Sequence, residues 1–136
     1  ELTDMISCKL LVCGSSTPVI ADNITAESLD ICTTSEKISL TFSENMRGKS
    51  EVKLSQDEGI IDIEILQLSK STGISIDASA SKGCIELGDI PGFSYSLNVH
   101  GRKDFNHITG QTEGFNDAPD SIKFTVKNAK GSIFFK

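Results

Sequence analysis

Residues 60–65 read Ile-Ile-Asp-Ile-Glu-Ile, and this stretch shows the pattern that recurs along the chain. Three isoleucines at positions 61, 63 and 65 alternate with Asp62 and Glu64. Because successive side chains of a β-strand point to opposite faces, the isoleucines would line a core and the carboxylates would face water. The stretch therefore predicts a β-strand that is buried on one side.

The same alternation of apolar and polar residues appears in many other segments of the chain. We find no sustained helical periodicity, no internal repeat and no linker. Glycine-containing turns separate the segments, and the turn at residues 128–131 predicts a hairpin. Several short strands with regular turns indicate an all-β sandwich or barrel. The alternating segments are residues 38–42, 52–54, 61–65, 74–76, 93–99 and 122–126, with shorter ones at 10–12, 84–87 and 132–135.

Length and charge narrow the class of protein. The 136 residues fit one domain, residues 1–136, with a core of its own. A net charge of −6 disfavours nucleic acid and anionic lipid as partners, and the chain lacks tryptophan for base stacking. No apolar run approaches the roughly 20 residues of a membrane span. Because the chain begins at Glu1, we expect a piece excised from a larger surface or secreted protein.

Four cysteines, Cys8, Cys13, Cys32 and Cys84, are candidates for disulfide bonds. An even count in a small chain favours two bonds and an oxidising compartment: extracellular, at a cell or virion surface, or periplasmic. The alternative is four reduced, buried thiols. If residues 8–13 are extended, their ends lie about 16 Å apart, too far for a bond between Cys8 and Cys13. We therefore expect each of these two cysteines to reach Cys32 or Cys84, without choosing between the two pairings. Asn23, in Asn23-Ile24-Thr25, is a glycosylation candidate.

No catalytic motif withstands inspection, so we expect no enzyme. Gly48-Lys49-Ser50 lacks the first glycine of a phosphate-binding loop. His100 and His107 are the only imidazoles that could activate a nucleophile, and both are read as surface residues. An enzyme of unrecognised type would have to use one of them.

The polar segment 101–120 is the longest irregular stretch, and loops on a β scaffold often carry binding sites. Its Asp104, Asp117 and Asp120 are candidate ligands for Ca²⁺, which prefers oxygen donors. The simpler interpretation is a solvated loop without a cofactor. A Ca²⁺-dependent or carbohydrate-binding module that uses this loop is one alternative function.

Three segments carry a resemblance to a known family. Residues 38–46, ISLTFSENM, resemble the opening strand of bacterial immunoglobulin-like repeat domains, and residues 90–99, IPGFSYSLNV, resemble a later strand. Phe124-Thr125-Val126 resembles the closing strand. The resemblance covers about residues 36–127 and implies an immunoglobulin-like β-sandwich of about 7–9 antiparallel strands in a surface or secreted protein. The N-terminal cysteines depart from that family, which leaves a viral envelope glycoprotein domain as another alternative.

The expected function is that of a structural or adhesive module acting through contacts with other protein domains or subunits. The terminal segment 132–135 is a candidate sheet edge for such contacts. Alternation turns one of Phe134 and Phe135 away from the core, so one of them would need a covering partner or would be exposed.

Overall fold

The computed structural model describes residues 2–3, 6–42, 47–65, 68, 71–90, 93–98 and 106–136, with backbone only for 2–3, 6–8, 93–98 and 106. The described chain is built from strands and one short 3₁₀ helix. In chain order the elements are β1 (Leu2–Thr3), β2 (Ile6–Gly14), β3 (Val19–Thr33), β4 (Lys37–Phe42), β5 (Lys49–Glu64), β6 (Gly73–Lys82), β7 (Ile85–Leu87), β8 (Phe93–Asn98), β9 (Asn106–Thr112), η1 (Phe115–Asp117) and β10 (Ser121–Phe135).

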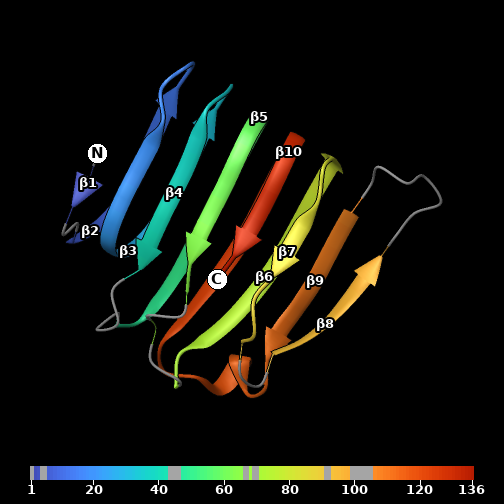
Figure 1. Ribbon diagram of the computed structural model, residues 1–136. Coiled ribbons are helices and arrows are strands. Elements are labelled where there is room, and N and C mark those ends of the chain that lie inside the picture. The colour runs from blue at the N-terminus through green and yellow to red at the C-terminus, as the bar shows by residue number, and fades with distance from the viewer. Residues whose placement is uncertain are drawn as a thin grey trace.

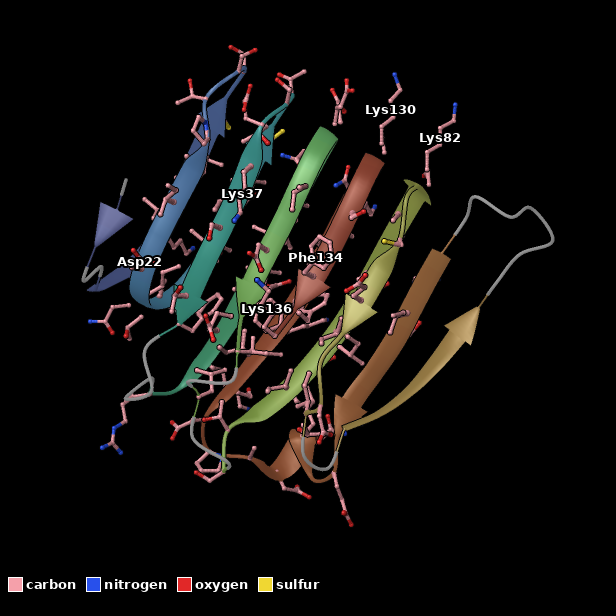
Figure 2. All side chains as sticks on the ribbon, viewed as in Figure 1. Asp22, Lys37, Lys82, Lys130, Phe134 and Lys136 are labelled. Atoms are coloured by element: carbon pink, nitrogen blue, oxygen red, sulfur yellow. The ribbon has the colours of Figure 1, made fainter. Side chains whose placement is uncertain are left out.

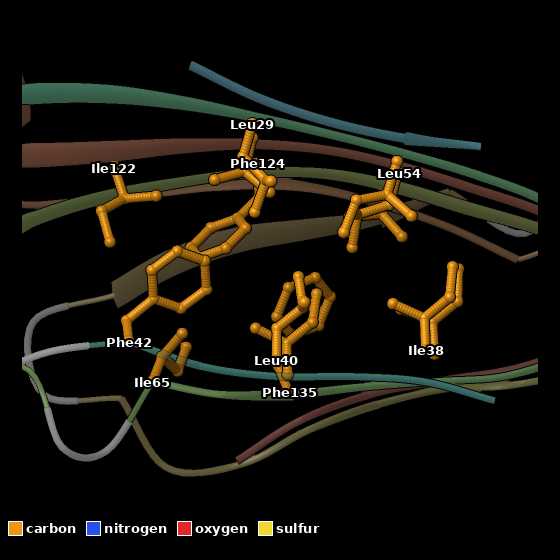
Figure 3. Packing of buried hydrophobic residues seen from close by; sticks show 14 of the residues in the cluster. Leu29, Ile38, Leu40, Phe42, Leu54, Ile65, Ile122, Phe124 and Phe135 are labelled. Atoms are coloured by element: carbon orange, nitrogen blue, oxygen red, sulfur yellow. The ribbon is translucent and has the colours of Figure 1, made fainter. Parts of the chain in front are cut away.

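The strands form one sheet that folds over on itself into two layers (Figures 1 and 3). Layer A contains β2, β6, β8 and β9 together with residues 25–33 of β3, 49–56 of β5 and 121–128 of β10. Layer B contains β1, β4 and β7 together with residues 19–24, 60–64 and 130–135 of the same three long strands. The long strands therefore bend from one layer into the other, and the chain winds as a flattened coil.

The all-β prediction is confirmed, but the expectation of purely antiparallel pairing is wrong. Among the described strands, only β6–β9 and β8–β9 pair antiparallel, and every other pairing is parallel. Alternation of apolar and polar residues fixes which face is buried and is the same for both strand directions. At residues 57–59 and 129–131 the chain turns into the other layer, so the hairpin expected at 128–131 is a corner inside β10.

The interpretation that the chain has no internal repeat is wrong, because a repeat of 23 to 24 residues underlies the coil. Its corner residues are Glu36, Gly59 and Gly83, and Gly131 occupies the equivalent place later in the chain. The same apolar positions recur around each corner. A buried apolar residue lies five positions before the corner residue, and further apolar residues lie two and four positions after it. The equivalent positions pair in register, as Ile31, Leu54, Val126 and Ala78 do in layer A and Ile38, Ile61, Ile133 and Ile85 do in layer B.

Three of the four corners, at Gly59, Gly83 and Gly131, stack so tightly on a neighbouring corner that a side chain does not fit. A Cβ atom on Gly59 would overlap the backbone oxygen of Glu36, and one on Gly131 would overlap that of Gly59. A Cβ on Gly83 would in turn overlap the oxygen of Gly131. Gly59 and Gly131 also have positive φ angles of 124° and 149°, which side chains disfavour. Glycine at these positions is thus required by the close approach of successive coils.

Inside the corners lies a short ladder of buried polar side chains. Thr33, Gln56 and Asn128 occupy register positions on adjacent strands, and each is at most 4% exposed. The amide nitrogen of Gln56 donates to Thr33 Oγ1 at 3.2 Å, and Asn128 Nδ2 donates to Gln56 Oε1 at 3.3 Å. These bonds satisfy polar groups that burial would otherwise leave without partners.

The last strand of the chain occupies the middle of the fold. β10 pairs with β5 on one side and with β6 and β7 on the other, so β5 and β6, which follow each other in the sequence, are separated by it (Figure 1). The free edge expected at residues 132–135 is therefore absent, because both sides of that segment are hydrogen-bonded.

The core lies between the two layers (Figure 3). Layer A contributes Leu29, Leu54 and Phe124, and layer B contributes Phe42 and Phe135 from the opposite side. The ring of Phe124 stands edge-on to both other rings, at centroid distances of 5.4 Å to Phe42 and 5.8 Å to Phe135. The described part of the chain contains no helix long and apolar enough to span a membrane.

Candidate functional site

The outer surface of layer B, here called face B, combines exposed apolar side chains with a small charged network. It contains Ile20, Ile60 and Phe134, of which Ile60 is 45% exposed and Ile20 39%. Phe134 points outward because Phe135 beside it is buried, as alternation predicted (Figure 2). One residue of the terminal pair closes the core and the other lies on the surface.

Asp62 organises the charges on face B. It is the register partner of Phe134, and its carboxylate accepts from Lys37 Nζ at 3.2 Å and from Lys136 Nζ at 3.0 Å. The side chain of Asp62 is only 16% exposed, whereas both lysines are about half exposed. The lysines hold the carboxylate beside the aromatic ring, and Glu86, the register partner of Phe134 on β7, adds a negative charge to the same face. Apolar and aromatic groups within a polar surround are a common composition for protein contact surfaces.

Layer A has two edge strands in the described part of the chain. At one side β2 pairs with β3 alone, and at the other β8 pairs with β9 alone. Leu11, at 69% exposure the most exposed large apolar residue of the described chain, lies on β2. The edge strand β2 thus lies near the start of the chain, whereas the sequence had suggested an edge at residues 132–135.

A pocket of about 380 Å³ lies on the outer surface of layer A. It is lined by β3, β5 and β10 on one side and by η1 on the other. Phe115 is half-buried there, packed over Gly73, where an added Cβ would lie 3.1 Å from the ring. The lining residues are Glu27, Lys49, Ser50, Glu51, Phe115, Asn116, Ser121 and Lys123.

Charges in this pocket are only partly paired. Glu51 forms an ion pair with Lys53 at 3.5 Å. Among the described residues, Lys49 and Lys123 form no ion pair, so two ammonium groups remain available to a ligand. Phe115 and Asn116 belong to the 101–120 segment that the sequence singled out as a binding loop, although Asn106–Thr112 of that segment form the strand β9.

The proposed calcium ligands are not assembled by the described chain. Asp120 accepts a hydrogen bond from the backbone nitrogen of Gly48 at 2.6 Å, and Asp117 is exposed in η1. Asp104 lies outside the described residues. Within the described part, no group of three or more His, Cys, Asp or Glu residues could hold a metal ion.

His107 lies on the open surface of layer A, and its Nε2 is 2.6 Å from Asp77 Oδ1. Ser79 is its register partner on β6, but the hydrogen bonds of the described residues include none between them. A His–Asp pair by itself supplies only part of a catalytic group. His100 lies outside the described residues.

The cysteines fall into different places in the coil. The backbone of Cys8 lies in β2, and Cys13, on the same strand, is the register partner of Cys32 on β3. The extended course of β2 separates Cys8 from Cys13 by about 16 Å, which excludes a bond between them as predicted. Cys13, Cys32 and Cys84 are exposed and carry free thiols in this structure, so no disulfide joins these three.

Asn23, the glycosylation candidate, is exposed in β3 where the pairing with β4 shifts register. Its φ of 54° lies in the left-handed region, which asparagine tolerates better than most residues. The position leaves its modification a prediction.

Comparisons with known proteins place the fold. No protein-family model matches the chain, and no curated protein sequence matches it. The structure is similar to the crystal structure of a "putative cell adhesion protein" from Clostridium sporogenes, with a TM-score of 0.72 and 18% sequence identity. The match covers 98% of this chain and 57% of that one. At this identity the similarity concerns the fold, and the chain corresponds to little more than half of its neighbour's length.

Proposed function

We propose that this chain is an adhesive module of a larger surface protein and that it contacts partner proteins through face B. The observation that carries the proposal is the pair Ile60 and Phe134, an exposed and a half-buried apolar residue on the outer surface, beside a carboxylate held by two lysines. The resemblance of the fold to a putative cell adhesion protein supports an adhesive role and a surface location.

The physical argument is one of desolvation. Exposed apolar side chains on a rigid sheet lose little conformational entropy when a partner covers them, so their burial favours binding. The Lys37–Asp62–Lys136 network adds fixed charges of both signs, which select a partner with complementary charged groups. Ile60 and Phe134 lie on strands that are paired with a neighbour on both sides, and this pairing fixes the spacing between the two residues.

Adherence of intact cells to surfaces coated with the protein tests this proposal. A panel of bacterial and animal cells is allowed to settle on the wild type, on a variant with Ile60→Ser and Phe134→Ser, and on an inert protein of equal net charge. We expect adherence to the wild type alone. Leu11→Ser, on the outer surface of layer A, is the matched control and should keep wild-type adherence. Equal adherence to the face B variant and the wild type would refute the role of face B.

A second candidate function is the binding of a saccharide in the pocket of layer A. Phe115 offers an aromatic surface, while Asn116, Lys49 and Lys123 offer hydrogen-bond donors around it. Its volume of about 380 Å³ lies within the range of small-ligand sites. Binding to an immobilised glycan library that is lost in Phe115→Ala and kept in Phe134→Ala would support it. No binding by the wild type to any glycan would rule it out.

A further inference from the structure

Two cysteines, Cys13 and Cys32, lie directly opposite each other on neighbouring strands. Cys13 of β2 and Cys32 of β3 are register partners in a parallel pair, and both side chains are exposed. Their neighbours fix the direction of these side chains: Ile31 and Thr33 are buried on either side of Cys32, and Val12 packs against the core. Both thiols therefore project from the outer surface of layer A at the same level of the coil.

We propose that Cys13 and Cys32 form a disulfide bond that joins β2 to β3. Neighbouring strands lie about 4.8 Å apart, which lies within the range of about 4.4–6.8 Å between the Cα atoms of bonded cysteines. The two side chains leave the sheet on the same face, so both sulfur atoms lie on the same side of the strand pair.

The remaining cysteines do not compete for this position. Between β3 and the corner that carries Cys84 lie β5 and β10. Three strand spacings amount to roughly 14 Å, about twice the separation that a disulfide permits. Cys84 is instead hydrogen-bonded to Ser132, with 3.3 Å between Sγ and Oγ. Of the two long-range partners that the sequence left open for Cys13, the register therefore selects Cys32.

The bond would hold a terminal strand of the fold, which has a neighbour on one side. Among the described strands, β2 pairs with β3 alone, and its Leu10 and Val12 are only partly buried. Terminal units of a stacked fold have a neighbour on one side and open first. A covalent link between β2 and β3 would keep the edge strand β2 from separating from its neighbour.

The oxidation requires an acceptor for two electrons, and a small-molecule disulfide such as oxidised glutathione supplies it. The Cys13 thiolate attacks one sulfur of that disulfide, which releases one small thiol and leaves a mixed disulfide. The Cys32 thiolate then attacks the Cys13 sulfur, which forms the protein disulfide and releases the second small thiol. The two protons lost by the cysteines are carried by the two released thiols. In the cell this chemistry rests on the proposed surface location.

Peptide mapping tests the pairing directly. The wild-type chain is incubated with oxidised glutathione, alkylated without reduction and digested. Trypsin alone leaves both cysteines on residues 10–37, so a second protease that cleaves after Glu27 is required to separate them. Because the same protease also cleaves after Glu36, we expect the fragments 10–27 and 28–36 to remain joined until a reductant is added. Cys13 and Cys32 alkylated after this treatment, or joined to other cysteines, would overturn the proposal.

A thermal measurement provides an independent readout. Adding a reductant to the oxidised protein should lower the midpoint of unfolding for the wild type and for Cys84→Ser, the matched control. The same reductant should leave Cys13→Ser and Cys32→Ser unchanged, and these two variants should match the reduced wild type. A reductant effect that persists in Cys13→Ser would refute the pairing. Because the oxidant is supplied in the tube, failure here leaves the proposed adhesive role of face B unaffected.

Discussion

The side-chain amide of Asn128 donates a hydrogen bond to the backbone oxygen of Gly59, with 3.0 Å between Nδ2 and O. This bond joins a corner of β10 to the equivalent corner of β5, although 69 residues separate the two in sequence. Asn128 Nδ2 also lies within bonding distance of Gln56 Oε1, and Asn128 itself is 2% exposed. A single buried amide thus connects the last strand of the chain to the coil that it completes.

Replacing Asn128 by aspartate should destabilise the protein strongly. Asn128→Asp removes the donor and places a carboxylate against the oxygen atoms of Gln56 and Gly59. We expect the free energy of unfolding to fall by about 2–4 kcal/mol. Urea denaturation measures it, with the exposed Asn116→Asp as a control that should change it by less than about 0.5 kcal/mol. Equal effects of the two substitutions would contradict the role of the ladder.

Alanine at the stacked corner should be poorly tolerated. In Gly131→Ala the new methyl group would collide with the backbone oxygen of Gly59, at a φ of 149° that disfavours side chains. We expect a loss of about 2–4 kcal/mol in the free energy of unfolding, since backbone must move to make room. Gly14→Ala is the matched control, because nothing lies within 4 Å of the added methyl and it should be nearly neutral. A stable Gly131→Ala would show that the corners are looser than described.

Alanine substitutions of the two terminal phenylalanines should lower the free energy of unfolding by very different amounts, although the residues are neighbours. Phe135 is 1% exposed and its ring contacts that of Phe124, whereas Phe134 faces outward. Phe135→Ala should lower the free energy of unfolding by about 3–5 kcal/mol because it leaves a cavity in the core. Phe134→Ala should cost about 1 kcal/mol or less. Thermal and urea unfolding of both variants check this, and a reversed order would place the wrong residue in the core.

Removal of β10 should abolish folding. Deleting residues 121–136 leaves β5 and β6 without the strand that lies between them and removes Ile122, Phe124, Val126, Ile133 and Phe135 from the core. We expect loss of the cooperative thermal transition and exposure of apolar surface to a hydrophobic dye. Deletion of residues 1–3 is the control, because β1 pairs over two residues and its loss should leave a cooperative transition. A cooperative transition without β10 would mean that the first coils fold alone.

Much of the local structure could be predicted from the sequence, but the direction of pairing could not. Alternation located the strand that contains Ile61 and Ile63 and showed that one of Phe134 and Phe135 would face outward. It could not distinguish parallel from antiparallel neighbours, because both directions bury the same face. The recurrence of a corner residue at Glu36, Gly59 and Gly83 was present in the sequence and would have indicated a coil. The antiparallel β8 and β9 and the loop before β10 interrupt that period and obscured it.

The candidate surfaces depended even more on tertiary structure. Lys37, Asp62 and Lys136 are far apart in the chain, and the register of β4, β5 and β10 brings them together. Phe115 reaches the pocket only because η1 packs over Gly73. Nothing in the local pattern indicated that the terminal strand would be central and that β2 and β8 would be the edge strands of layer A.

The sequence by itself determined the all-β class, the buried face of most strands and the outward course of one terminal phenylalanine. These properties follow from local geometry, because each strand residue points opposite to its neighbour whatever lies beside it. Only the tertiary structure decided that the strands stack in parallel coils, that β10 lies between β5 and β6, and that Cys13 faces Cys32. Register and strand order depend on which segments bury the most apolar surface together, and this is a property of the whole chain.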